Sequence, residues 1–246
     1  MHQVPGTSEA IPHYYPSLVL GQFLSRQVAE QALPTTRRVF SRGDLLYGLG
    51  LPADEIFYLL EGRVMISLYS RHGSAVILDC REAGEIVGEL TLFGVPRRKT
   101  EARAVYRTRA LVIKTKRLLS AIEAQQHQQL LLQYMGLEVL QALELIETFA
   151  LDQVEHRLAK RLLFSIQKAR VAYPPGADVL DFSHEELAQM VGTSRQVVTQ
   201  IMEKFRRAGL LEYARRHIKI KEEQILAFIQ GGKLSPLVAS DDIERS

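Results

Sequence analysis

Cysteine and long apolar runs are almost absent from the sequence, and each absence excludes a class of protein. Cys80 is the single cysteine among 246 residues. One thiol cannot close an intrachain disulfide, and it falls far short of the ligand sets of zinc or iron–sulfur sites. No run approaches the roughly 20 apolar residues that a membrane-spanning helix needs, and the first residues lack the pattern of a signal peptide. The sequence therefore predicts a cytoplasmic protein with no membrane span and no protein-borne metal cluster.

The signatures of common enzyme classes are missing too. The chain has no GxSxG elbow, no phosphate-binding GxxxxGK[ST] loop and no Rossmann fingerprint. His184 and Glu185 begin like a zinc-binding HExxH motif, but position 188 is alanine. The seven histidines are scattered along the chain and give no support to haem or zinc. We therefore predict no catalytic residues and no metal site.

The composition indicates a globular chain whose positive charge is unevenly distributed. Apolar residues make up 46% and charged residues 24%, which is ordinary for a folded protein, and the chain length favours two domains. The net charge is only +3, but residues 195–221 hold eight Lys and Arg against Glu203 and Glu212 alone. Such a local excess is typical of a surface that meets a polyanion.

Residues 37–117 carry the pattern of an antiparallel β-roll. Apolar residues alternate in short runs, as at Val64, Ile66 and Leu68, which indicates strands with one buried face. Glycines separate the runs, as the turns of a compact roll require. These are Gly43, Gly62, Gly73, Gly84 and Gly88. Cys80 lies within one run, where packing is the expected role of a lone cysteine and a redox-active thiol is the alternative.

Residues 118–153 are predicted to contain a long dimerisation helix. The stretch from Gln125 to Ala150 has no proline and is rich in good helix formers. Apolar residues recur along it at steps of four and three, the spacing of a coiled-coil seam. The seam consists of Leu132, Val139, Leu143 and Ile146, together with Gly136 and Ala150. An exposed apolar seam of this length is a liability, so we predict that it packs against a second copy of the chain. Packing on its own domain is the alternative.

Residues 154–230 predict a winged helix-turn-helix. A first helix ends before Pro174-Pro175, because proline cannot continue it. Ser183 and Glu186 form a capping box at the start of the next helix. Gly192 then separates that helix from a second one, which is the helix-turn-helix signature. A short hairpin with basic residues at its tip follows and forms the wing.

Polar side chains of the second helix and the wing are predicted to contact DNA. Arginine can bond bidentately to guanine and glutamine to adenine, while hydroxyls and basic wing residues suit phosphates. The predicted DNA-contacting residues are Ser183, Ser194, Arg195, Gln196, Thr199, Gln200, Lys204, Arg215 and Arg216. A solvated polar helix face is the alternative for this set.

This order of segments resembles the Crp/Fnr superfamily, named after the cyclic AMP receptor protein and the fumarate–nitrate regulator. The resemblance covers about residues 37–221 and rests on Glu61-Gly62-Arg63, the run from Gly84 to Phe93, and the helix-turn-helix from Glu186 to Phe205. It implies an α+β chain with a jelly-roll-like sensor, a dimerisation helix and a winged helix-turn-helix. The predicted boundaries are 1–36 for an N-terminal segment, 37–117 for the sensor roll and 118–153 for the dimerisation helix region. The winged helix-turn-helix is predicted at 154–230 and a disordered tail at 231–246.

The resemblance also implies a function. It implies a homodimeric transcription regulator with double-stranded DNA and RNA polymerase as partners, a palindromic operator and an effector pocket in the roll. Cyclic AMP receptors usually carry arginine, glutamate and arginine at the base-reading positions, and this chain keeps only Arg195. The operator is therefore expected to differ from the family's TGTGA half-site. A cyclic-nucleotide-binding module without direct DNA binding is the alternative function.

For the sensor, the resemblance points to a Gly-Glu-Leu motif that holds ribose in nucleotide-binding relatives and a later arginine that neutralises the phosphate. The effector-binding residues implied are Gly88, Glu89, Leu90, Arg98, Lys99 and Thr100. Glu101 would bring negative charge towards a phosphate, and Ala142 and Leu143 stand where a Thr–Ser pair would bind adenine. The sequence therefore disfavours a cyclic nucleotide and leaves another ligand or none. A purely structural role, with Glu89 paired to a cation such as Arg98, is the alternative.

Overall fold

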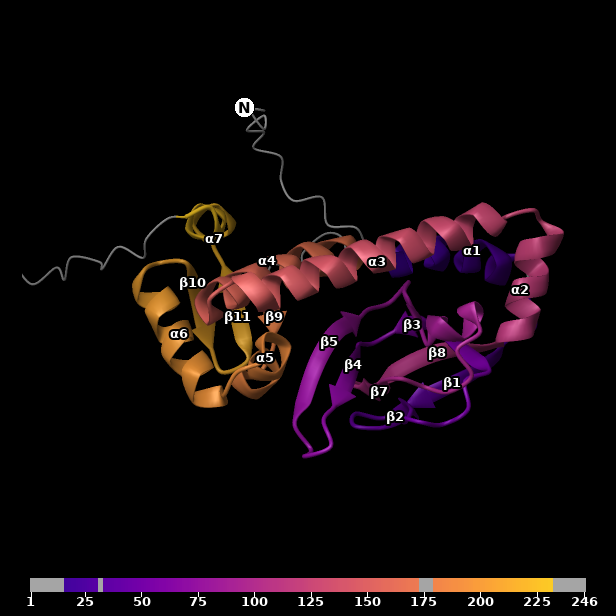
Figure 1. Ribbon diagram of the computed structural model, residues 1–246, viewed down its shortest axis with the longest axis horizontal. Coiled ribbons are helices and arrows are strands. Elements are labelled where there is room, and N and C mark those ends of the chain that lie inside the picture. Colours follow the sequence, from indigo (N-terminus) through magenta and orange to yellow (C-terminus); the bar gives the residue numbers. More distant parts are fainter. Residues whose placement is uncertain (1–15, 31–32, 173–178, 232–246) are drawn as a thin grey trace, which may run out of the picture.

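The chain folds into two units that a long helix connects, as the computed structural model shows (Figure 1). The structure describes residues 16–30, 33–172 and 179–231. An antiparallel β-roll forms the first unit, and a small sheet with flanking helices forms the second. The predicted α+β architecture is thereby confirmed. The predicted disordered tail lies, apart from Gly231, outside the described residues.

The roll consists of two four-stranded antiparallel sheets, with strand orders β1-β8-β3-β6 and β2-β7-β4-β5. Its strands are β1 (Thr36–Phe40), β2 (Leu45–Tyr47), β3 (Glu55–Glu61), β4 (Val64–Tyr69), β5 (Ala75–Arg81), β6 (Ile86–Val87), β7 (Glu101–Ala104) and β8 (Thr108–Lys114). Buried apolar side chains from both sheets pack together, among them Phe57, Val64, Ala102 and Val112. This shared core explains the apolar alternation in the sequence.

Glycine forms the turns of the roll, as predicted. The five glycines named above all have φ between 83° and 95°, a region that residues with a Cβ atom rarely enter. At Gly62 the space is limiting as well, because an added Cβ would lie only 2.8 Å from the carbonyl oxygen of Arg107. Glycine is therefore required at this turn on two separate grounds.

The predicted alternation in β4 is wrong for the second half of the strand. Val64 is buried, but Leu68 is 41% exposed while Ser67 is buried. The pairing of β4 with β5 shifts by one residue between Ile66 and Ser67. The extra residue is Leu78 on β5, because Ile66 pairs with Asp79 and Ser67 pairs with Ile77. Strand β4 pairs with β7 only as far as Ser67, so Leu68 lies beyond that pairing and is exposed.

Four helices connect and cover the units: α1 (Pro16–Ala29), α2 (Thr115–Ala124), α3 (Gln128–Leu151) and α4 (Val154–Ala172). The long helix α3 confirms the predicted helix and runs from the roll to the second unit (Figure 1). The sequence did not lead us to expect α1 within the N-terminal segment. It packs against α3 and β6, with Leu20 and Leu24 fully buried, so tertiary packing stabilises this helix.

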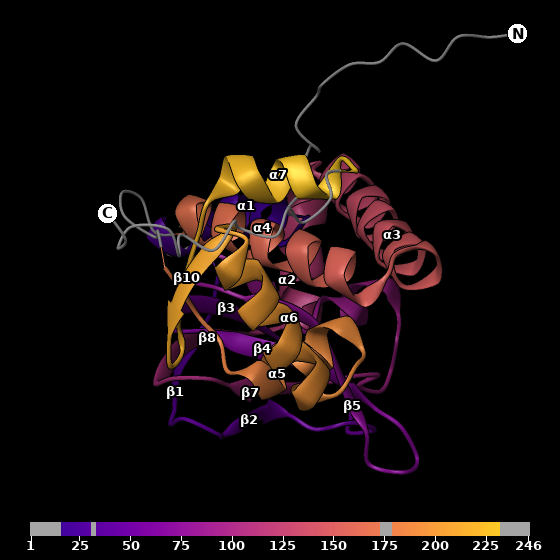
Figure 2. The same ribbon diagram turned by 90° about the vertical axis from the view of Figure 1, so that its left-hand side faces the viewer.

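The second unit contains β9 (Leu180–Asp181), α5 (His184–Val191), α6 (Arg195–Arg207), β10 (Leu211–Ala214), β11 (His217–Ile220) and α7 (Glu222–Ile229). Its sheet has the order β10-β11-β9. Ile77 and Cys80 of β5 belong to the same buried core as Phe182 and Phe205 of this unit, and α5 packs on β5. The second unit is therefore docked on the roll, with α6 facing away from it (Figure 2).

Candidate nucleic-acid interface and sensor cavity

Two serine caps set the two helices of the helix-turn-helix. The backbone N–H of Glu186 donates to Ser183 Oγ at 3.2 Å, and the backbone N–H of Ser183 donates to Glu186 Oε2 at 2.7 Å. Gly192 ends α5 with φ 64°, a left-handed conformation that suits glycine. The predicted capping box and glycine turn are confirmed. Helix α6 begins at Arg195, with Ser194 as its N-cap.

Helix α6 has one buried face and one exposed face. Val198, Ile201, Met202 and Phe205 are buried in the core. The polar residues on adjoining turns of the opposite face are exposed, namely Arg195, Gln196, Thr199 and Gln200. This exposed set offers one guanidinium and two amide groups, the groups that read base edges in a major groove.

His184 at the start of α5 contacts this face. Its Nδ1 lies 2.9 Å from Thr199 Oγ1. Partial burial and the nearby charge of Arg195 lower the pKa of His184. The imidazole is therefore neutral at physiological pH, and it orients Thr199 without adding positive charge to the face.

Of the two arginines at the tip of the wing, Arg215 forms no ion pair with a residue that the structure describes, whereas Arg216 forms two. Strands β10 and β11 pair as the predicted hairpin, and Arg215 at the turn has φ 57° and is exposed. The Arg216 guanidinium turns back, 2.5 Å from Asp181 Oδ1 and 2.9 Å from Glu186 Oε2. These ion pairs attach the wing to β9 and α5, and the role of Arg216 as a DNA contact stays a prediction.

Ion pairs also neutralise part of the basic segment after α6 begins. Lys204 Nζ lies 2.8 Å from Glu155 Oε1, and Arg206 and Arg207 share the carboxylate of Glu203. Three cations of the segment form no ion pair with any residue that the structure describes: Arg195, Arg215 and Lys219. Unneutralised positive charge is thus concentrated at the start of α6 and on the wing.

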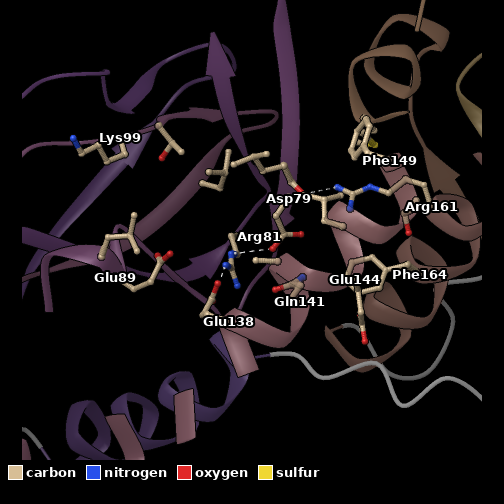
Figure 3. Close-up of a pocket in the computed structure, with 18 of the residues that line it drawn as sticks. Asp79, Arg81, Glu89, Lys99, Glu138, Gln141, Glu144, Phe149, Arg161 and Phe164 are labelled. Carbon is tan, nitrogen blue, oxygen red and sulfur yellow. Dashed lines mark hydrogen bonds and ion pairs between the residues drawn. The ribbon is translucent and has the colours of Figure 1, made fainter. Parts of the chain in front are cut away.

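A cavity of about 500 Å³ lies between the roll, α3 and α4 (Figure 3). The residues predicted to bind an effector all line it: Gly88, Glu89, Leu90, Arg98, Lys99 and Thr100. Gly88 has φ 88° and starts a short 3₁₀ helix, η1 (Glu89–Phe93), which brings Glu89 to the cavity. Lys99 is exposed, while Thr100 Oγ1 lies 3.3 Å from the Tyr47 hydroxyl.

Arg98 is bonded within the roll and is not free to meet a ligand. It is buried, and its Nη1 donates to the Gly88 carbonyl at 3.0 Å while its Nη2 donates to the Glu55 carbonyl. The guanidinium carbon also lies 4.2 Å from the centre of the Tyr47 ring. Within the described part of the chain, Arg98 forms no ion pair with Glu89, contrary to the pairing suggested by the sequence.

Arg81 is the cation beside Glu89, and the sequence did not single it out for the cavity. Its guanidinium lies 3.1 Å from Asp79 Oδ2 and 3.1 Å from Glu138 Oε1. Lys168 of α4 lies 3.1 Å from the same Asp79 carboxylate. Burial raises the pKa of Asp79, but these cations outweigh it and hold that pKa at about 2. Burial raises the pKa of Glu89, and the charge of Arg81 opposes this.

The apolar seam of α3 is uncovered within one chain. Leu132 is 67% exposed, Val139 50%, Leu143 56% and Ile146 63%. None of these four lines the cavity. Packing of the seam on its own domain, the alternative left open by the sequence, is therefore excluded for these four side chains.

Cys80 is buried, as expected for a packing role. Burial raises the pKa of its thiol to about 12, although Arg161 and Arg63 oppose the shift. A thiol with so high a pKa is a poor nucleophile. Among the described residues, no group of three or more His, Cys, Asp and Glu could hold a metal ion, and no described helix is long and apolar enough to cross a membrane.

Comparison with known protein families gives one match for each unit of the fold. Residues 37–125 match the cyclic nucleotide-binding domain, and residues 156–229 match the Crp-like helix-turn-helix domain. The chain belongs to the Crp/Fnr superfamily. It is accordingly a DNA-binding transcription regulator and not an enzyme.

Individual relatives in the Crp/Fnr superfamily are distant. The chain is 25% identical over 205 residues to the global nitrogen regulator of Synechocystis sp., covering 79% of this chain and 88% of that protein. It is 25% identical over 190 residues to the CRP-like cAMP-activated global transcriptional regulator of Mycobacterium tuberculosis, covering 76% and 85%. The structure of FixK2 from Bradyrhizobium japonicum superposes with a TM-score of 0.69 at 18% identity, covering 79% of this chain and 96% of that one. This likeness shows the Crp/Fnr fold.

The two α3 positions that the resemblance relates to adenine binding carry apolar side chains, those of Ala142 and Leu143. Ala142 lines the cavity, whereas Leu143 does not and is largely exposed on the seam. Neither side chain can form the hydrogen bonds that the family resemblance assigns to these positions. The nucleotide-binding domain is thus present as a fold, with a changed set of lining groups.

Proposed function

We propose that the chain acts as a homodimer that binds a two-fold symmetric operator, with α6 of each copy in a major groove and each wing on the neighbouring backbone. The exposed polar face of α6 carries the proposal, because its opposite face is buried and leaves no other side to bind DNA. Arg195 suits guanine, and Gln196 and Gln200 suit adenine. RNA polymerase is the second partner that the family resemblance implies, and both partners are met in the cytoplasm.

The uncovered α3 seam supports dimerisation. Two parallel copies of α3 would bury the seam and set the two α6 helices about one DNA turn apart. Leu143→Glu is expected to give monomers in sedimentation and to weaken operator binding. Leu68→Glu, an exposed leucine on the roll, serves as the control. A Leu143→Glu protein that stays dimeric would contradict the proposed seam.

A cyclic nucleotide is disfavoured as the effector at the roll end of the cavity. A cyclic phosphate needs an unbonded cation, and Arg98 is bonded to two carbonyls. Glu89 and Glu138 add negative charge there. Calorimetry with cyclic AMP and cyclic GMP is expected to give millimolar or no binding. Tight binding of either nucleotide would overturn this assignment.

Selection from random duplex DNA tests the operator assignment. Enriched sites are expected to contain two half-sites related by two-fold symmetry, about 10 base pairs apart from centre to centre, and binding should weaken steeply with salt. An unmodified TGTGA palindrome would contradict the role of Gln196 and Gln200. Failure to enrich any site would contradict the proposed docking of α6.

A further inference from the structure

The cavity does not end at the roll, since the DNA-binding unit forms one of its walls. Beyond Glu89 it continues between β5, α3 and α4, where it is lined by Arg157 and Arg161 of α4 and by Met190 and Val191 of the second unit. Figure 3 shows Glu89 and Lys99 at one side of the cavity and Phe149 and Arg161 at the other. A molecule at this second end would touch both units at once.

The second end of the cavity has apolar walls. They are formed by Ile66, Leu78, Leu145, Phe149, Leu163 and Phe164. These side chains come from β4, β5, α3 and α4. Such walls favour an apolar ligand body, since ligand pockets combine apolar surface with a few polar groups that set orientation.

Two arginines of α4 supply those polar groups. Arg157 and Arg161 are four residues apart and share one helix face. Arg157 Nη1 donates to the Phe149 carbonyl at 3.4 Å, and Arg161 Nη2 donates to the Leu78 carbonyl at 3.3 Å. The Nε atom of each is buried without a hydrogen-bond partner among the described residues. Two partly buried guanidinium groups with such weak hydrogen bonding favour an anion, which forms stronger charge-assisted hydrogen bonds.

The carboxylates around the cavity do not fill this role. Asp79 is bonded to Lys168 and Arg81. Glu144 and Glu147 are exposed, and neither forms an ion pair with the two arginines in the described part of the chain. The charge of Arg161 acts on Asp79, but neither Arg157 nor Arg161 forms an ion pair with a carboxylate in the described part of the chain, so both can still bind a small anion.

We propose that this end of the cavity binds an organic carboxylate with an apolar body, its carboxylate on Arg157 and Arg161 and its chain along the apolar walls. The Arg161 bond to Leu78 joins α4 to the roll, and α4 packs in the same core as the DNA-binding unit. A ligand carboxylate competes with that carbonyl and loosens the docking of the two units, so the ligand regulates the DNA-binding function proposed above, on which this role rests.

Calorimetry on the full-length protein without DNA tests the site, with octanoate, 1-octanol and acetate as probes. Octanoate is expected to bind, and octanol and acetate to bind at least about tenfold more weakly, because one lacks the charge and the other the apolar body. Equal binding of octanol, or no binding of octanoate, would overturn the proposal. Because DNA is absent, a failed operator selection leaves this outcome unaffected.

Arginine variants locate the site. Arg157→Gln and Arg161→Gln are expected to weaken octanoate binding by about tenfold each. Arg107→Gln, an exposed arginine of the roll, should leave it unchanged. Unaltered octanoate binding in both cavity variants would place the ligand elsewhere and overturn the proposal. The comparison of octanoate with octanol on the unmodified protein holds even if a variant fails to fold.

Discussion

The helix-turn-helix and the sensor cavity are assembled in opposite ways. The reading face of α6 and its caps come from one continuous stretch, Ser183 to Gln200. The cavity draws its lining from Tyr47 to Ile229 and from both units. Side chains of the first face solvent, whereas Arg81 and Asp79 of the second are paired with Glu138 and Lys168, far along the chain. A local pattern can therefore specify the first site, while only the fold assembles the second.

This difference in assembly determines whether a charged side chain is available to bind a partner or is bonded within the fold. Arg195 has no ion-pair partner within the described residues and can meet DNA. Arg81 and Arg98, by contrast, are bonded to groups that the fold brings to them. Substitutions on the reading face should therefore alter binding and leave stability unchanged, whereas substitutions of the paired cavity groups, such as Arg81 and Arg98, should alter stability first.

The largest expected effect follows Lys168→Met. Lys168 Nζ is buried against Asp79 (3.1 Å), Glu85 (3.1 Å) and the Cys80 carbonyl (2.6 Å). Its loss leaves buried charge uncompensated, so the free energy of unfolding in urea should fall by about 3–5 kcal/mol. Lys114→Met, which removes an exposed ion pair, is the control, with a loss of about 0–1 kcal/mol. Equal losses in the two variants would show that the buried cluster does not stabilise the docked units.

A smaller effect is expected in acid. The folded pKa of Asp79 is about 2, below its ordinary 3.8. As the pH falls, the unfolded chain therefore takes up this proton at a higher pH than the folded chain does. The stability that ionised Asp79 contributes is on the order of 2 kcal/mol; it is present above about pH 4 and is lost as the pH falls towards 2. Urea unfolding measured between pH 5 and pH 2 checks this. Asp79→Asn should lack this part of the acid dependence, and an identical pH slope would refute the assignment.

The smallest effect is expected at the cap of α5. Ser183→Ala removes the acceptor for the Glu186 N–H and should lower stability by about 1 kcal/mol. Ser120→Ala on an exposed position of α2 is the control, with no loss. If Ser183→Ala leaves the unfolding free energy unchanged but weakens DNA binding, the hydroxyl acts as a DNA contact and not as a structural cap.

Sequence patterns predicted most of the fold because they are local. The glycine turns, the long helix and the capping box each depend on residues within a few positions of one another. The exposure of Leu68 and the presence of α1 were not predicted, because both depend on tertiary contacts. Leu68 is exposed because β4 pairs with β7 only as far as Ser67, and packing on α3 stabilises α1.

The cavity was less predictable for the same reason. Gly88, Glu89 and Arg98 were placed correctly on its wall, but their partners were not. Arg81 meets Glu138 across 57 residues, and Asp79 meets Lys168 across 89. No spacing rule in the sequence reports such pairs.

The central claim is that α6 reads DNA through its exposed polar face. The most direct test is the affinity of an Arg195→Ala, Gln200→Ala double variant for the selected operator and for random duplex. Operator affinity is expected to fall by about 1–3 kcal/mol for each lost base contact, approaching the affinity for random duplex. Arg107→Ala should change neither value. Unchanged operator affinity and selectivity in the double variant would contradict the account.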